Sequence, residues 1–356
     1  MAEINLARGQ FASEVDTTWT QESYLLGKVS TKYENIAGSV KSFTVLSPLT
    51  VPLVDYTRSG DSRFGKMSEV EDEIQTLEMS KDRSFTKSLD RGNQSDQMHL
   101  KSAGAFAKQQ MMEQVIPEQD EWGFKRFAFE AGTSLVQAQV DKNNIMGFVL
   151  VGRAAMNNAK VPLENRYMYI GTTNCNFVRL SPQFQALDGI GSKVVEKGLI
   201  GMLYNFKVIE MPDEYLPTGV QFLLMHKDAG IMPKKIQMLR ILTEQKGIDG
   251  SVVEGRFYYD AFVLAKKAGG IFTSVLTANK VATPVITPTG ASHAVGAVSG
   301  VTFKYTLDGS DPRYSATAVT YTGEVTLTDG QTIIVAGFAD ADNKCISNTA
   351  TATYTA

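Results

Sequence analysis

The sequence predicts an α+β protein that ends in a separate all-β domain. Apolar residues recur every three or four positions between residues 97 and 158, as on the buried face of helices. In the segments before and after, they alternate with polar residues, as in strands. A third observation is a change of composition near Val281. With 43% apolar and 21% charged residues, the 356-residue chain is expected to fold into a globular protein.

The charge balance and the two cysteines exclude several classes of protein. The net charge of −3 shows no basic excess, so wrapping nucleic acid is not the main task. Cys175 and Cys345 lie in different segments and are expected to be free thiols. The N-terminal stretch MAEINLARGQ has no apolar core of a signal peptide, and the longest apolar run, IMGFVLVG, is too short to span a bilayer. We therefore expect a protein made in the cytoplasm and not inserted in a membrane.

The first 96 residues predict two extended features. Residues 1–40 are polar and weakly patterned, which indicates an arm, with a short helix near TQESYLLGKV, that lies on another surface such as a neighbouring subunit. Residues 41–96 then alternate on both sides of the glycine-rich tip SGDSRFGKM, which predicts one long hairpin. A two-stranded ribbon with few apolar side chains is only marginally stable alone. The hairpin therefore predicts assembly.

The central part predicts three helices and a mixed region. The first helix runs from Gln97 to Ile116 and is expected to end at Pro117. A second begins with acidic residues in its first turn and buries Trp122, Phe127, Ala128, Ala131 and Leu135. A third covers residues 144–158. Further on, ENRYMYIG and VQFLLMHK predict strands, LIGMLYNFKVIEMP predicts a strand pair turned at Tyr204-Asn205, residues 234–244 predict a helix, and GRFYYDAFVLAKKAGGIFTSV predicts two short returning strands.

Residues 281–356 differ from the rest of the chain. They hold three basic and six acidic residues and are rich in threonine, valine and alanine, so the preceding 280 residues are balanced in charge. Such a composition favours a β-module with its own core, and TANKVATPVITPTG marks the boundary. Deletion of residues 281–356 is therefore expected to leave assembly intact.

No enzyme signature is found in the sequence. It lacks the phosphate loop of nucleotide-binding proteins, the zinc-protease helix motif and the serine-hydrolase elbow, and GIGSKV lacks the third glycine of a dinucleotide site. His99, His226 and His293 lie in three separate segments. The acidic residues around Glu69 are expected to alternate between faces and stay solvated, so they form no acid–base pair. We expect no catalysis, no metal and no cofactor.

Two clusters remain as candidate contact residues. The first lies at the hairpin tip and is assigned to contacts between subunits, the alternative being a merely solvated tip: Arg58, Arg63, Phe64, Lys66, Glu71 and Glu73. The second surrounds FKYTLDGSDPRY and is assigned to contact with a surface glycan or an ion: Asp308, Asp311, Tyr314 and Tyr321. The alternative for the two aspartates is a structural role in turns at Asp308-Gly309 and Asp311-Pro312. A calcium site would need a longer run of spaced oxygen ligands than this stretch offers.

The order of these segments resembles that of tailed-bacteriophage major capsid proteins with the Hong Kong 97-type fold. The stretches that carry the resemblance are VPLENRYMYI with SPQF, EKGLIGMLYNFKVIEMP with YLP, and GRFYYDAFVLAKKAGGIF. The resemblance covers roughly residues 1–277. It implies an N-terminal arm (1–40), an E-loop hairpin (41–96), a P domain with a spine helix (97–145), an A domain (146–245) and a return to the P domain (246–280).

The last 76 residues resemble a second family. VTFKYTLDGSDPRYSA and VTYTGEVTLTDGQTIIVAGFAD are similar to the immunoglobulin-like module at the C-terminus of chitobiases and β-hexosaminidases, and the similarity covers nearly all of residues 281–356. No glycosidase catalytic domain precedes the module here.

Together the two resemblances imply a structural protein. The chain would self-assemble into hexamers and pentamers of an icosahedral phage head around double-stranded DNA, with the immunoglobulin-like domain as an outward decoration. The implied location is the virion capsid, assembled in the cytoplasm of the host bacterium. The implied partners are further copies of the chain, a scaffolding protein and the portal, with only non-specific proximity to DNA. The alternative is a carbohydrate-binding or carbohydrate-active protein with a chitobiase-type accessory module.

Overall fold

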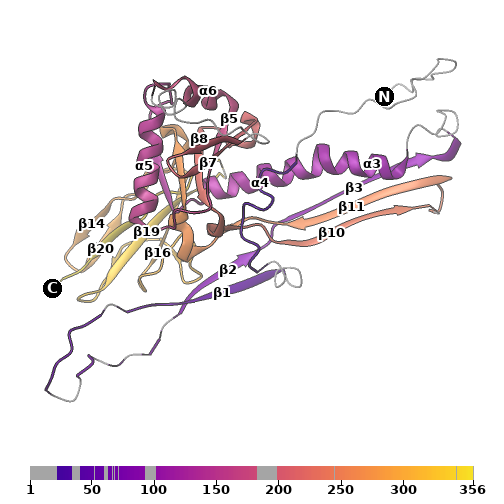
Figure 1. The fold of residues 1–356 in the computed structure, drawn as a ribbon. Helices are drawn as coiled ribbons and strands as arrows, with labels where there is room; N and C mark the ends of the chain where they lie inside the picture. The colour runs from indigo at the N-terminus through magenta and orange to yellow at the C-terminus, as the bar shows by residue number, and fades with distance from the viewer. Residues whose placement is uncertain are drawn as a thin grey trace.

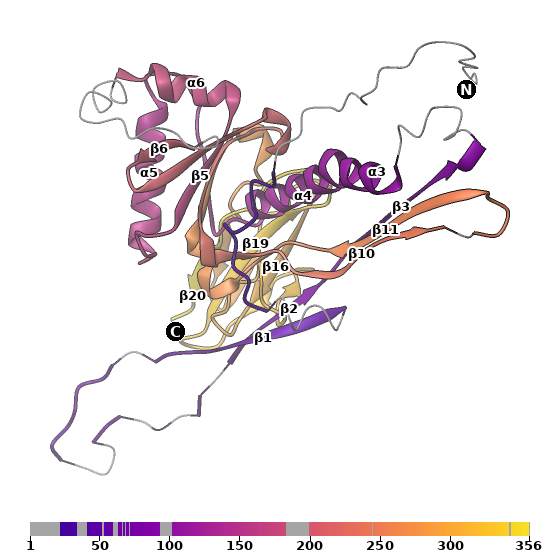
Figure 2. The ribbon, with the colours of Figure 1, turned by 45° about the vertical axis from the view of Figure 1, so that its right-hand side comes forward.

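The computed structural model describes most of the chain: residues 22–33, 41–51, 53–59, 63–65, 67, 69–70, 72–92, 102–182, 199–243, 245–341 and 343–355. A mixed α/β body lies at the centre, with a long helix and a β-ribbon projecting from it to one side (Figure 1). The hairpin extends in another direction, and the C-terminal strands form a separate group beside the body (Figure 2). Most of the predicted arm, Lys66, Glu71 and residues 183–198 lie outside the described residues.

A six-stranded sheet forms the centre of the body. In spatial order its strands are β4 (Thr133–Val136), β13 (Ile271–Val275), β8 (Val220–His226), β5 (Arg166–Gly171), β7 (Phe206–Met211) and β6 (Leu199–Leu203). All residues of β5 are buried, because both faces of the sheet are covered. Met168 and Ile170 face the cluster that packs under α5 (Ile145–Asn158) and α6 (Thr172–Leu180), whereas Tyr167 and Tyr169 face the opposite cluster.

Several predicted elements are confirmed in this body. The strand predicted at ENRYMYIG is β5, and the helix predicted at residues 144–158 is α5. The pair β6–β7 turns at Tyr204 and Asn205, whose φ values of 47° and 72° are those of a tight hairpin turn. Leu135, predicted on a helix, lies in β4 instead, because the second helix ends at Phe129.

The long helix continues through Pro117, so the predicted end at that residue is wrong. The helix comprises α3 (Ala103–Gln110), a π-helical turn (Met111–Val115) and α4 (Ile116–Phe129). In the π-turn the Ile116 N–H bonds to the Met111 carbonyl, five residues back. Proline has no N–H and its ring crowds the preceding turn. The wider π-turn directly before Pro117 relieves that crowding, so the helix keeps its direction.

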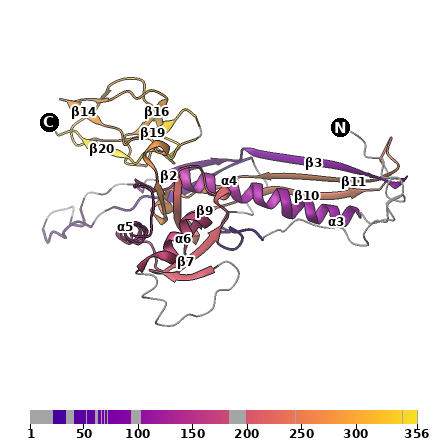
Figure 3. The same ribbon diagram turned by 90° about the horizontal axis from the view of Figure 1, so that it is seen from above.

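The projecting ribbon contains strands where the sequence predicted a helix. It is an antiparallel sheet of β10 (Lys234–Leu242), β11 (Gly250–Tyr259) and β3 (Lys81–Asp90), which runs beside the long helix (Figure 3). The helix predicted at residues 234–244 is therefore wrong: Ile236, Leu239 and Leu242 recur at a helical spacing, but pairing with β11 along the whole strand decides the structure.

The predicted hairpin is shorter than residues 41–96. Its strands are β1 (Ser42–Pro48) and β2 (Asp72–Glu78), paired from Ser42–Glu78 to Pro48–Asp72. The expected continuation of the return strand is β3, which pairs with β11 and belongs to the ribbon. Burial explains the division, because Leu77 and Met79 pack into the body whereas β3 is mostly exposed.

The C-terminal residues form two facing sheets, named the sandwich below. One sheet holds β14 (Ile286–Thr289), β15 (Ser292–Val295) and β18 (Val325–Thr326); the other holds β17 (Val319–Thr320), β16 (Val301–Thr306), β19 (Thr332–Ala339) and β20 (Ala350–Thr353). The sandwich has a buried cluster of its own, formed by Val295, Phe303, Leu327, Ile333 and Val335. Two short strands, β9 (Gly230–Ile231) and β12 (Phe262–Val263), pair near the base of the hairpin.

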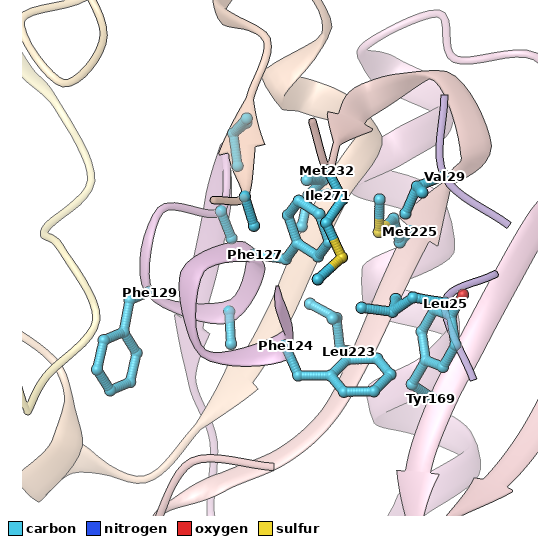
Figure 4. Close-up of a cluster of buried hydrophobic side chains, with 14 of the residues drawn as sticks. Leu25, Val29, Phe124, Phe127, Phe129, Tyr169, Leu223, Met225, Met232 and Ile271 are labelled. Atoms are coloured by element: carbon cyan, nitrogen blue, oxygen red, sulfur yellow. The ribbon is translucent and has the colours of Figure 1, made fainter. Parts of the chain in front are cut away.

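Residues 22–33 are bound to the body rather than free of it. Leu25 and Val29 belong to the largest buried cluster, together with Phe124 (Figure 4). Asp120 of α4 accepts hydrogen bonds from Ser23 Oγ at 2.7 Å and from the Tyr24 N–H at 2.6 Å. Burial raises the pKa of this carboxyl group, although both hydrogen bonds act in the opposite direction. The end of the predicted arm is therefore anchored on the long helix. Within the described residues, no helix is long and apolar enough to cross a membrane.

Leu25→Ala should release this anchored segment, because Leu25 is 1% exposed and packs in the core. We expect a loss of about 2–5 kcal/mol in the free energy of unfolding and faster proteolysis within residues 22–33. Leu26→Ala is the matched control, since Leu26 is 73% exposed. Equal effects of the two substitutions on urea unfolding and on cleavage rate would contradict the anchoring.

Candidate functional site

The described residues offer no evident centre for catalysis. Among them, no three histidine, cysteine or acidic side chains are placed to hold a metal ion. His226 Nδ1 accepts the Asp228 N–H at 3.1 Å, and burial lowers its pKa. Cys175 and Cys345 are free and buried, and burial raises the pKa of each thiol to about 12, which leaves them unreactive at neutral pH. His99 lies outside the described residues.

Two open clefts lie on the surface of the described residues. One, of about 190 Å³, separates the long helix from the ribbon and is crossed by an Arg83–Glu118 ion pair of 2.6 Å. The other, of about 220 Å³, lies just after α5 and is lined by Lys160, His226 and Lys267. Both are small for a metabolite site, which usually has a volume of about 300–1,000 Å³. Neither cleft therefore has the size of an ordinary metabolite site.

The hairpin carries many exposed apolar side chains, most of them beyond its paired strands. Phe64 is 86% exposed and Leu53 fully so. Exposed apolar side chains gathered on one segment of a chain indicate an interaction site. The residues that form it are Leu46, Val51, Leu53, Val54, Tyr56, Phe64, Met67 and Val70.

One ring contact and one backbone hydrogen bond join the two sides of the hairpin tip. The rings of Tyr56 and Phe64 lie 5.0 Å apart at 65°, and the Thr57 N–H donates to the Arg63 carbonyl at 3.1 Å. Arg58, Arg63 and Phe64, all predicted as contact residues, are exposed here. The structure thus brings three of the six predicted contact residues to one exposed loop.

Glu73 does not fit the prediction. Its side chain is 7% exposed and forms a 2.6 Å ion pair with Lys266 of the same chain. The alternation expected along the strand is real, but one face of β2 lies against the body and not against water. A carboxylate on that face is buried and paired internally, so Glu73 is not available for a neighbour.

The base of the hairpin is fixed to the body by side chains that sequence reasoning missed. Gln75 Nε2 donates to the Val263 carbonyl at 2.8 Å, and the Ala265 N–H donates to Gln75 Oε1 at 3.0 Å. The buried Gln75 amide therefore links β2 to backbone groups of residues 263 and 265. Apolar packing completes the base through Phe43, Val45, Leu77, Met79, Phe262 and Leu264.

A buried carboxylate holds the corner between β2 and β3. Asp260 is 1% exposed and accepts hydrogen bonds from Ser80 N at 2.8 Å, Ser80 Oγ at 2.9 Å and Trp122 Nε1 at 2.8 Å. It thereby joins the hairpin, the ribbon and α4 at one point. Charge-assisted hydrogen bonds of this kind are stronger than neutral ones.

The predicted glycan or ion contacts in the sandwich are engaged within the chain. Although burial acts to raise it, hydrogen bonds from Ser310 and Thr317 hold the pKa of Asp308 below its usual value. Asp311 binds the Arg313 guanidinium, with Nη2 to Oδ2 at 2.7 Å. Tyr321 OH accepts the Val295 N–H at 2.9 Å. Tyr314 is 8% exposed, so the prediction that it lies on the surface is wrong.

Comparison with known proteins gives a likeness in structure. No protein-family model matches the sequence, and no curated protein matches it significantly. The fold is similar to a chain of Mycobacterium phage Che8, with a TM-score of 0.57 and 16% identity over 77% of this chain and 98% of that one. It is also similar to the capsid structure of the cyanophage P-SCSP1u, with a TM-score of 0.60 and 13% identity over 77% and 94% of the two chains.

A further match is the asymmetric unit of the mature capsid of bacteriophage PhiM1, with a TM-score of 0.59 and 11% identity. The shared fold is a phage capsid fold. The phage chains are matched over 93–98% of their length but cover 77% of this one, so this chain carries residues beyond the shared fold. The resemblance inferred from the sequence is confirmed at this level.

Asp260→Asn should destabilise the corner between β2 and β3. One acceptor oxygen is replaced by an amide donor that faces other donors, which we expect to cost about 1–3 kcal/mol in the free energy of unfolding. Asp249→Asn is the control, because that side chain is 72% exposed. Denaturant unfolding that shows no difference between the two variants would rule out this role for Asp260.

Proposed function

We propose that the chain is a phage major capsid protein that self-assembles into hexamers and pentamers of an icosahedral head around double-stranded DNA. The single observation that carries the proposal is a hairpin with a fixed base and an exposed apolar far part, on a chain with a phage capsid fold. The base gives the hairpin a direction, and its exposed side chains need a partner surface.

The driving force for assembly is the burial of this apolar surface on a neighbouring copy. Each fully buried Val, Leu or Phe side chain contributes about 1.5–3 kcal/mol. Part of that gain offsets the loss of translational and rotational freedom on association. A closed shell repeats the same contact at every subunit, so modest individual contacts are sufficient for a stable particle. Arg58 and Arg63 lie beside the apolar side chains and can select the neighbour by charge.

Each part of the chain corresponds to one part of the proposed capsid subunit. Residues 1–40 form the arm and the β1–β2 hairpin the E-loop. The P domain (97–145, with the return 246–280) holds the long helix and β11, and the A domain (146–245) holds α6 and the strands β5 to β8 at the capsomer axis. The sandwich is an immunoglobulin-like domain on the outer surface. A scaffolding protein and the portal are partners during assembly in the host cytoplasm, and the mature location is the virion.

The contacts within the sandwich weigh against a carbohydrate-active protein. Tyr314 is buried, and Asp308 and Asp311 accept hydrogen bonds from their own domain. These engaged side chains offer no ready platform for a sugar ring. We therefore propose the capsid function and not a carbohydrate-active one.

The double substitution Leu53→Ser/Phe64→Ser should abolish assembly without unfolding the chain. Both side chains are exposed in the subunit, so we expect an unchanged melting temperature. Electron microscopy should show closed shells or capsomers for the unmodified chain, expressed alone or with its gene neighbours, and dispersed subunits for the variant. Val285→Ser, at an exposed apolar position on the sandwich side of the chain, is the control that should assemble normally.

Two results would contradict this proposal. One is a monomeric unmodified chain under all assembly conditions. The other is a double variant that forms shells as readily as the unmodified chain, because the hairpin tip would then play no part in the lattice.

A further inference from the structure

A short segment of the sandwich leaves its sheets and lies against the body. This segment, named the strap, comprises residues 311–316 between β16 and β17. The Tyr314 hydroxyl donates to the Glu130 carbonyl at 2.6 Å. Arg313 Nη1 donates to the Ala131 carbonyl at 3.2 Å and to the Gly132 carbonyl at 2.9 Å. One end of the strap therefore binds the chain where α4 ends.

Of these acceptors, the Glu130 carbonyl is a group for which the helix itself supplies no donor. The last carbonyls of an α-helix lack intrahelical donors, and a cation placed there also interacts favourably with the helix dipole. Glu130 is the C-cap of α4, and Ala131 and Gly132 follow it. The guanidinium is 7% exposed, and Asp311 neutralises it through Nε–Oδ1 and Nη2–Oδ2 contacts of 3.0 and 2.7 Å. The pairing makes burial of this charge tolerable.

The other end of the strap binds the hairpin. The Ala316 N–H donates to the Ile74 carbonyl at 2.9 Å. Ile74 lies in β2 opposite Leu46 of β1, and β2 has no second strand beside it among the described residues. The strap thus occupies part of an open strand edge, and six residues link the end of α4 to the base of the hairpin.

Other contacts hold the sandwich in the same position. The Ile346 N–H donates to the Phe129 carbonyl at 3.0 Å, the Ser134 N–H donates to Asn348 Oδ1 at 3.3 Å, and Lys280 Nζ donates to the Ser134 carbonyl. Tyr314 and Cys345 belong to the largest buried cluster, together with residues of α4. Figure 3 shows the sandwich beside α4 and β2. The expectation of a simply removable domain does not fit these contacts, because removal would expose core side chains and leave helix carbonyls unpaired.

We propose that the sandwich is an internal brace, in which Arg313 and Tyr314 are positioning residues that set the base of the hairpin relative to α4. This inference rests on the proposed function for its consequence, since a braced hairpin points its apolar side chains in one direction for the neighbouring subunit. The brace itself is a property of the single chain and is tested there.

The test is hydrogen exchange measured by mass spectrometry on the unassembled chain. Arg313→Gln removes the bonds to Ala131 and Gly132, and we expect roughly tenfold faster exchange in peptides from β2 and the strap. Tyr314→Phe keeps the buried ring and loses only the hydroxyl, so it should fold and give a smaller rise in the same peptides. Lys344→Gln makes the same change of charge at an exposed residue of the sandwich and should leave exchange unaltered.

A peptide from β5 is the internal reference, because general destabilisation would speed its exchange equally. The brace is overturned if both variants loosen the strap while exchange in β2 stays at its original rate, or if β2 and β5 change together. Failure of the unmodified chain to form shells would count against the proposed function alone. Normal shells from a variant with a loosened β2 would show that the brace exists but does not direct assembly, which overturns its stated consequence.

Discussion

The structure depends on one constraint, which is that the far part of the β1–β2 hairpin exposes apolar side chains that the rest of the described residues leave uncovered. Leu53, Phe64 and Met67 are each more than four-fifths exposed. A ribbon of two strands cannot bury them by folding on itself. Contact of this surface with water would be relieved by binding to another molecule, and the capsid function proposed above makes a second copy of the chain the expected partner.

A surface of this kind is useful only if it is held in place. The carboxylate of Asp260 fixes the corner where the hairpin joins the ribbon, and the Gln75 amide fixes β2 to the segment after β12. The Glu73–Lys266 ion pair adds a third attachment, and the strap bond to Ile74 a fourth from the sandwich. Asp260 also accepts a hydrogen bond from Trp122 of α4, and Arg313 of the strap donates to Gly132 just after α4, so the hairpin and the long helix are oriented together.

The sequence predicted what local patterns determine, such as β5, α5 and the turn at Tyr204-Asn205, because each has a clear period or turn signal. It did not predict what distant partners determine. Proline normally ends a helix, and the π-turn that accommodates Pro117 has no sequence signature. The apolar spacing in β10 is helical, and its pairing with β11 depends on residues that the local pattern does not include. Glu73 and Tyr314 were expected at the surface for the same reason, since their partners Lys266 and Glu130 come from distant segments.

The central claim, that the exposed hairpin is covered by a neighbouring copy, is tested most directly by comparing backbone hydrogen exchange of residues 49–70 in free subunits and in purified particles. Burial at an intersubunit contact should slow exchange in this segment by at least about tenfold on assembly, which corresponds to 1.4 kcal/mol of added protection. Exchange in β5, already buried in the subunit, should not change. Equal and fast exchange of residues 49–70 in both samples would contradict the claim.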